Sequence, residues 1–83
     1  MMDRSKLLLA LEEDHNGNWE TAHDIVQTMS SREACWIHAY LHRKEGDIGN
    51  AGYWYSRAGK PMSTKLLDEE WNELFDTVSS LDH

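Results

Sequence analysis

Apolar residues recur along this chain at intervals of three and four residues, which is the spacing of one face of an amphipathic α-helix. In residues 3–13 this face consists of Leu7, Leu8 and Leu11. In residues 19–29 it consists of Trp19, Ala22, His23, Val26 and Met29. The turn signal Asn16-Gly17-Asn18 stands between the two segments. The pattern therefore predicts two helices joined by a tight turn.

The middle of the chain carries the start and stop signals of a third helix. Ser30, with Glu33 three residues later, has the spacing of a capping box and predicts a helix over about 31–45. Gly46 follows directly, and a glycine at this place can end a helix in the left-handed conformation.

Two more helices follow in the second half of the chain. Asp47 is placed to cap a fourth helix, which should reach Ala58 because Gly59 comes next. Ser63 or Thr64 is expected to open a fifth helix that runs to residue 79. The apolar face of this helix consists of Leu66, Leu67, Trp71, Leu74, Phe75 and Val78.

The fold class follows from these elements. No segment alternates apolar and polar residues over a useful length, so we predict an all-α protein of five helices. A chain of 83 residues has room for one domain, here residues 1–83. We expect a first hairpin over 3–29, a second over 31–58, and a capping helix over 63–79 that covers the fourth helix.

The two hairpins repeat one plan at an offset of 29 residues. The shift aligns the segment 17–22 with the segment 46–51, and it places Ala10 on Ala39. Each hairpin therefore has one small side chain per helix, where the two backbones could approach closely.

The chain resembles the tetratricopeptide and Sel1-like helical repeats at a set of turn and second-helix positions: Gly46-Asp47, Ala51, Tyr55, Ala58 and Pro61. The resemblance implies helical hairpins with a concave side that takes peptides. Residues 36–59 also resemble a family of small bacterial proteins with an HAYLHRKEGD, NA, YWY, RAG pattern. That second resemblance implies no activity.

Charge is distributed unevenly along the chain. The net charge of −7 divides into −4 for residues 1–31, +2 for 32–60 and −5 for 61–83. An acidic protein is a poor candidate for nucleic-acid binding, which draws on clustered Lys and Arg. The longest apolar run has five residues, too few to cross a bilayer, and the single cysteine, Cys35, fits a reducing compartment. We expect no membrane contact and a cytoplasmic location.

A histidine pair on the third predicted helix is the candidate metal site. His38, His42 and Glu45 follow at positions i, i+4 and i+7, so they project from a common side. His23 on the second helix could supply a third nitrogen ligand for zinc. The competing interpretation is that these histidines are structural and bridge the core to buried hydrogen-bond partners. We expect no cofactor under that interpretation and Zn under the other.

A second group of residues is the candidate partner-binding surface. Tyr, Trp and Arg anchor protein interfaces because they bury a large area and keep a polar end. The candidates on the third and fourth helices are Trp36, Tyr40, Arg43, Lys44, Tyr53, Trp54 and Arg57. The alternative places Trp36 and Tyr40 in the core and pairs Arg43 with an acid such as Glu45 or Asp47. Tyr55 is expected in the core.

These observations favour a small protein-interaction module that binds an acidic or C-terminal peptide or a partner helix. A metal-binding protein is the alternative function, and a homodimer through the Trp36 or Trp54 face is an alternative use of the surface. We predict no catalytic residues: Cys35 and His38 lack an orienting third group, and no phosphate-binding loop is recognisable.

Overall fold

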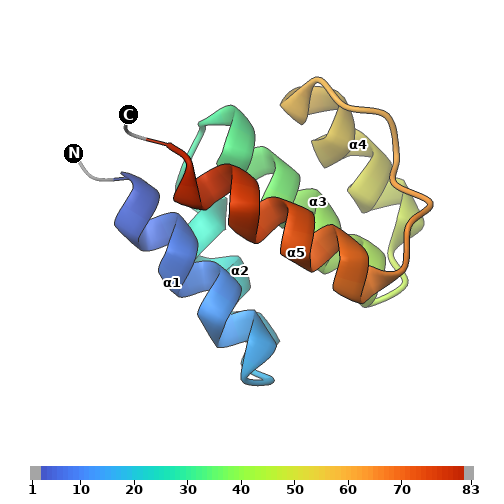
Figure 1. Cartoon of the computed structure of the whole chain (residues 1–83). Helices are drawn as coiled ribbons and strands as arrows, with labels where there is room; N and C mark the ends of the chain where they lie inside the picture. Colours follow the sequence, from blue (N-terminus) through green and yellow to red (C-terminus); the bar gives the residue numbers. More distant parts are fainter. Residues whose placement is uncertain (1–2, 82–83) are drawn as a thin grey trace.

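The computed structural model describes residues 3–81 and confirms the all-α prediction (Figure 1). Within these residues the chain forms five helices: α1 (Asp3–His15), α2 (Trp19–Gln27), α3 (Arg32–Lys44), α4 (Ile48–Ala58) and α5 (Leu67–Ser79). None of them is both long and apolar enough to span a lipid bilayer.

The turn between α1 and α2 and the turn between α3 and α4 have the same geometry, 29 residues apart. Gly17 has φ 88° and Gly46 has φ 89°, the left-handed conformation that a side chain disfavours. The amides of Asn18 and Asp47 then donate to the carbonyls five residues earlier, both at 2.8 Å. The internal repeat seen in the sequence is therefore a repeat of local structure.

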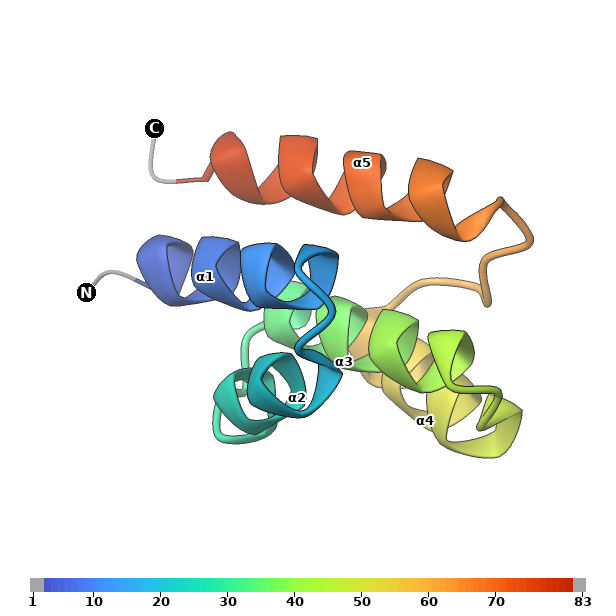
Figure 2. The same cartoon turned by 90° about the horizontal axis from the view of Figure 1, so that it is seen from below.

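Helix α3 lies at the centre of the molecule. Every side chain from Ala34 to Leu41 is buried, because α1, α2, α4 and α5 all pack against this helix. The four alanines of the predicted close approaches are fully buried: Ala10, Ala22, Ala39 and Ala51. In Figure 2, α5 runs along one side of the molecule, α2 and α4 lie on the other, and α1 and α3 lie between them.

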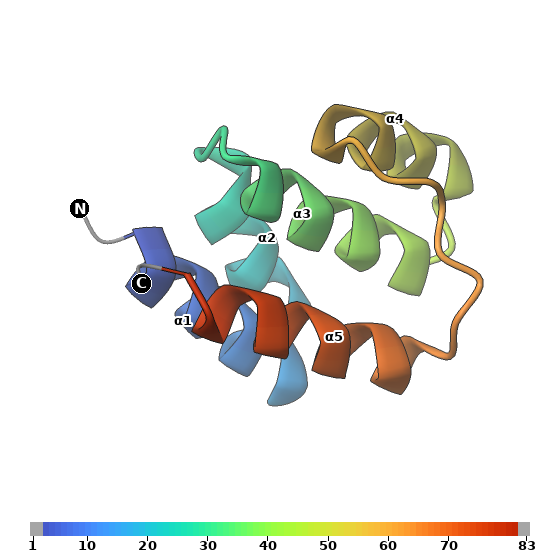
Figure 3. The same cartoon turned by 45° about the horizontal axis from the view of Figure 1, so that its top comes forward.

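The position of α5 differs from the prediction. It packs against α1 and α3, and it does not cover α4 (Figure 3). Leu74 and Val78 are fully buried in this contact, and the indole N–H of Trp71 donates to the carbonyl of Leu11 at 3.0 Å. The last helix therefore closes the face of α1 and α3 that lies away from α2 and α4.

Two predicted helix starts are wrong. Ser31, and not Ser30, caps α3, because its hydroxyl accepts from the amide of Ala34 at 3.2 Å. Helix α5 begins at Leu67 and not at Ser63 or Thr64. The Ser63 hydroxyl accepts from the amide of Lys65, and the next residue is extended.

Leu66 therefore lies outside α5, and its side chain is 70% exposed where an apolar face was predicted.

The predicted start and stop signals of α4 are confirmed. The Asp47 carboxylate accepts from the amide of Asn50, and Gly59 ends α4 with φ 72°.

Candidate metal centre

Three histidines from two helices converge between α2 and α3. His38 and His42 lie one turn apart on α3, and α2 packs against α3 so that His23 faces them. One ligand nitrogen from each histidine lies within 4.8 Å of the others. The Nε2 atoms of His23 and His38 are 3.1 Å apart. We call these three residues the histidine cluster.

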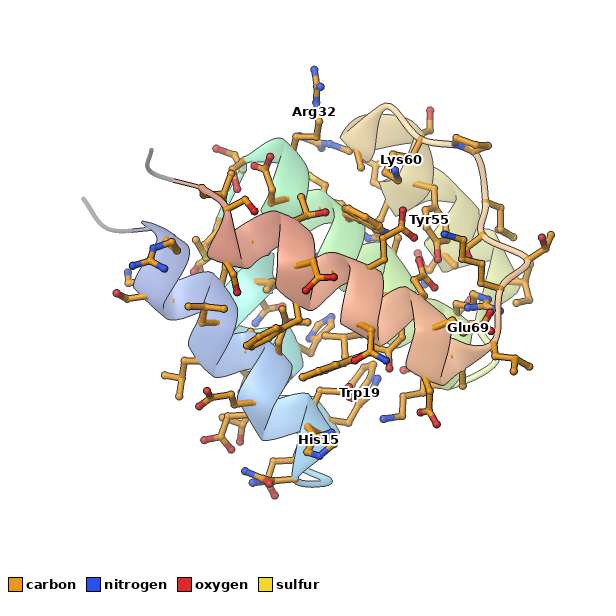
Figure 4. The ribbon with its side chains drawn as sticks, viewed as in Figure 1. His15, Trp19, Arg32, Tyr55, Lys60 and Glu69 are labelled. Carbon is orange, nitrogen blue, oxygen red and sulfur yellow. The ribbon has the colours of Figure 1, made fainter. Side chains whose placement is uncertain are left out.

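Two tryptophans enclose the histidine cluster. The ring of Trp54 on α4 stacks on His38 with centroids 3.9 Å apart, and the ring of Trp19 stacks on His23 at 5.0 Å. The Trp19 indole N–H donates to the carbonyl of Leu41 at 2.8 Å, which fixes its position against α3 (Trp19 is labelled in Figure 4). The imidazoles are therefore held by packing as well as by their helices.

Burial favours the neutral form of two imidazoles in the histidine cluster, those of His23 and His38. Desolvation, with a smaller contribution from His23 and His42, lowers the pKa of His38 to about 4. Desolvation and the neighbouring His42 also lower the pKa of His23, although the carboxylates of Asp24 and Glu45 act in the opposite direction. At neutral pH both rings have the uncharged form that binds metal ions.

His42 connects the histidine cluster to two acids at the end of α3. Its Nδ1 is buried and has no hydrogen-bond partner within residues 3–81. The nearest carboxylate oxygen, Oε2 of Glu45, lies 3.8 Å away, beyond hydrogen-bonding distance. His42, Glu45 and Asp47 form a second group, in which one ligand atom of each residue lies within 4.8 Å of the other two. Glu45 therefore lies beside His42, and it is not part of the set formed by the three histidines.

Two of the predicted partner-binding residues are internal, and two more form ion pairs with other helices of the chain. Trp36 and Tyr40 are 5% and 2% exposed and belong to the core. Arg43 pairs with Glu70 of α5 at 2.7 Å, and Lys44 pairs with Asp14 of α1 at 2.9 Å. Glu45 and Asp47 had been predicted as alternative partners of Arg43. That prediction was wrong, because α5 covers this side of α3.

Glu70 is the buried residue that the sequence interpretation missed. Its side chain is fully buried and accepts from Trp36 Nε1 at 3.0 Å, Tyr55 Oη at 2.5 Å and Arg43 Nη1 at 2.7 Å. The sequence did contain a signal: Glu70 is three residues from Leu67 and four from Leu74, on the apolar face of its helix.

The remaining candidates lie on α4. Tyr53 is 54% exposed, and its hydroxyl accepts from Arg57 at 3.1 Å. The Arg57 guanidinium lies 5.2 Å from the Trp54 ring centroid, a cation–π contact. Tyr55, by contrast, is buried as predicted (Figure 4). Of the predicted surface, Lys44, Tyr53 and Arg57 are exposed.

The chain matches no protein-family model, no curated protein and no solved structure. The functional argument therefore depends on the geometry of the described residues.

Proposed function

We propose that this protein binds a transition metal ion of the zinc class through His23, His38 and His42. The observation that supports the proposal is the convergence of three ligand nitrogens, all within 4.8 Å of one another, from two separate helices.

The spacing of these nitrogens is close to that of a coordinated set. Zinc binds imidazole nitrogen at about 2.0–2.1 Å, so two nitrogens on one tetrahedral ion lie about 3.3 Å apart. The Nε2 atoms of His23 and His38 are already 3.1 Å apart. In the metal-free chain one of these nitrogens can donate a proton to the other, and the ion would take the place of that proton.

The ligand type restricts the choice of ion. Neutral imidazoles suit Zn²⁺, Cu²⁺, Ni²⁺ and Co²⁺, and they do not suit Mg²⁺ or Ca²⁺, which prefer oxygen. Glu45, beside His42, or a water molecule would supply a fourth ligand. Because the three ligands belong to α2 and α3, a bound ion would also tie the first hairpin to the second.

Calorimetric titration of untagged, chelator-treated protein with ZnCl₂ tests this function. We expect one equivalent of zinc to bind, and His42→Asn to weaken binding at least tenfold because one ligand is lost. His15→Asn is the matched control, since His15 is an exposed histidine at the end of α1, away from the cluster (Figure 4).

His23→Asn provides a second variant at a less buried position, in case His42→Asn does not fold. Equal zinc binding by the cluster variants and the His15 control would disprove the proposal. The absence of zinc binding by the unaltered protein would do the same.

Protein binding is the second candidate function, supported by the outward position of Tyr53 and Arg57 on α4. Helix α4 packs mainly against α3 and reaches α5 through Tyr55, and the exposed side chains of Tyr53 and Arg57 would offer a partner helix or peptide a contact surface. Arg43 and Lys44 are already neutralised by Glu70 and Asp14, so Arg57 would carry the attraction for an acidic partner.

A capture experiment from the native host tests this second function. We expect Tyr53→Ala and Arg57→Ala to lose a partner that the unaltered chain retains. Leu9→Ala is the control, because Leu9 is an exposed apolar residue on α1. Equal capture by all variants would reject α4 as the interface. A homodimer and membership of the tetratricopeptide-like repeats stay predictions.

A further inference from the structure

A groove between α1 and α5 lies apart from the histidine cluster. The two helices lie side by side (Figures 1 and 2), and they belong to the two most acidic segments of the sequence, 1–31 and 61–83. Two hollows of about 420 Å³ and 320 Å³ open there, and His15 and Trp71 line both of them. We call the two hollows together the Trp71 groove.

The wall of the larger hollow has more negative than positive charge. Asp14 and Asp68 line it together with a single ammonium group, that of Lys44. Lys44 Nζ contacts Oδ1 of Asp14 at 2.9 Å, and Oδ2 of Asp14 has no hydrogen-bond partner within residues 3–81. Asp14 is 2% exposed, and a buried carboxylate oxygen without a partner is costly. The carboxylates that line the larger hollow therefore outnumber its ammonium groups by one, so the hollow would attract a cation.

The floor of the Trp71 groove is aromatic. The Trp71 ring stacks with Phe75 at 5.3 Å and lies 5.1 Å from His15. Aromatic faces attract cations and also pack against hydrocarbon. Glu12 and Phe75 line the smaller hollow, so it combines a carboxylate with an aromatic surface as well.

We propose that the Trp71 groove binds an organic ammonium ion, a primary amine with an apolar body. The ammonium group would lie in the larger hollow near Asp14 and Asp68, and the apolar body would lie against Trp71. A volume of about 420 Å³ is in the range of small-ligand sites. This inference goes beyond the proposed metal site and shares no residue with it.

The test is an NMR titration of the full chain with phenethylammonium chloride, followed through the Trp71 indole N–H signal. The signal is assigned by its loss in Trp71→Phe. We expect a saturable shift, and we expect Asp68→Asn to weaken binding about tenfold because a charge-assisted contact is lost. Asp68 is exposed, so this variant should fold.

Glu69→Gln is the matched control. It removes the same charge from the neighbouring residue, which does not line either hollow and lies near the loop before α5 (Figure 4). We expect it to change binding less than twofold. Equal weakening by both variants would overturn the proposal, since it would indicate unspecific attraction to an acidic protein.

Two further probes define the ligand class. Phenylacetate has a similar apolar body and the opposite charge, and binding as tight as that of phenethylammonium would overturn the proposal. N-acetyl-lysine methylamide carries its ammonium on a peptide-like body. If it binds as well as phenethylammonium, the groove takes amines presented by proteins; if phenethylammonium binds alone, the ligand is a free amine.

Discussion

Two buried polar clusters lie on different sides of α3, and they differ in how completely their polar atoms are paired. Around Glu70, each carboxylate oxygen accepts a hydrogen bond, from Arg43 on one side and from Trp36 and Tyr55 on the other. In the histidine cluster, His23 and His38 meet through one pair of nitrogens, and Nδ1 of His42 has no partner within the described residues.

The difference separates a structural cluster from a candidate binding site. A fully paired buried network holds helices in one arrangement and has no capacity left for a ligand. Buried polar atoms without partners destabilise the fold unless something else, such as an ion, satisfies them. Glu70 therefore fixes α5 to α3 and α4, whereas the histidine cluster is the place where a ligand would gain most.

The largest effect is expected at Glu70. Glu70→Ala would leave Arg43 and the Trp36 and Tyr55 donors without their acceptor, and breaking a buried ion pair in this way costs about 3–5 kcal/mol. The free energy of unfolding in urea measures this loss. A change below about 1 kcal/mol would show that the α5 contact does not depend on this network.

A smaller, pH-dependent effect is expected at the histidine cluster. The pKa of His38 is about 4 in the folded chain and near 6.5 when exposed, so the unfolded chain takes up this proton first. The stabilisation is complete above about pH 6.5 and is lost as the pH falls toward 4, by about 3 kcal/mol.

Urea unfolding in the presence of a chelator measures this pH dependence. His38→Gln should flatten it between these pH values, and His15→Gln should leave it unchanged. An identical pH profile for the His38 variant and the unaltered protein would contradict the burial of a neutral imidazole.

The smallest expected effect distinguishes two neighbouring tyrosines of α4. Tyr55→Phe removes a buried donor to Glu70 and should destabilise the protein by about 1.5 kcal/mol. Tyr53→Phe removes an exposed hydroxyl that contacts Arg57, and should change stability by less than about 0.5 kcal/mol. Thermal and urea unfolding of both variants provide the comparison. Equal losses would mean that the Glu70 network is not more stabilising than a surface contact.

The sequence predicted those parts of the fold that depend on neighbours in the chain. Gly46, Asp47 and Gly59 gave the ends of α3 and α4, because capping and positive φ are local properties. The predicted start of α5 was wrong. Ser63 and Thr64 have side chains that can cap a helix, but the Ser63 hydroxyl accepts a hydrogen bond from the amide of Lys65 within a loop.

Contacts between helices that are distant in the sequence were harder to predict. The spacing of His38 and His42 on one helix predicted their common side, but the approach of His23 depends on how α2 packs against α3. Trp36 and Arg43 had the composition of an interface, and they do contact an acidic helix. That helix is α5 of the same chain, which no local signal in α3 could indicate.

The most direct test of the metal-binding proposal is anomalous diffraction at the zinc absorption edge from crystals grown with one equivalent of ZnCl₂. The account predicts a single strong peak between the imidazoles of His23, His38 and His42, about 2.0–2.1 Å from a nitrogen of each ring. The contradictory result is a map without a peak there, in which the Nε2 atoms of His23 and His38 still lie at hydrogen-bonding distance.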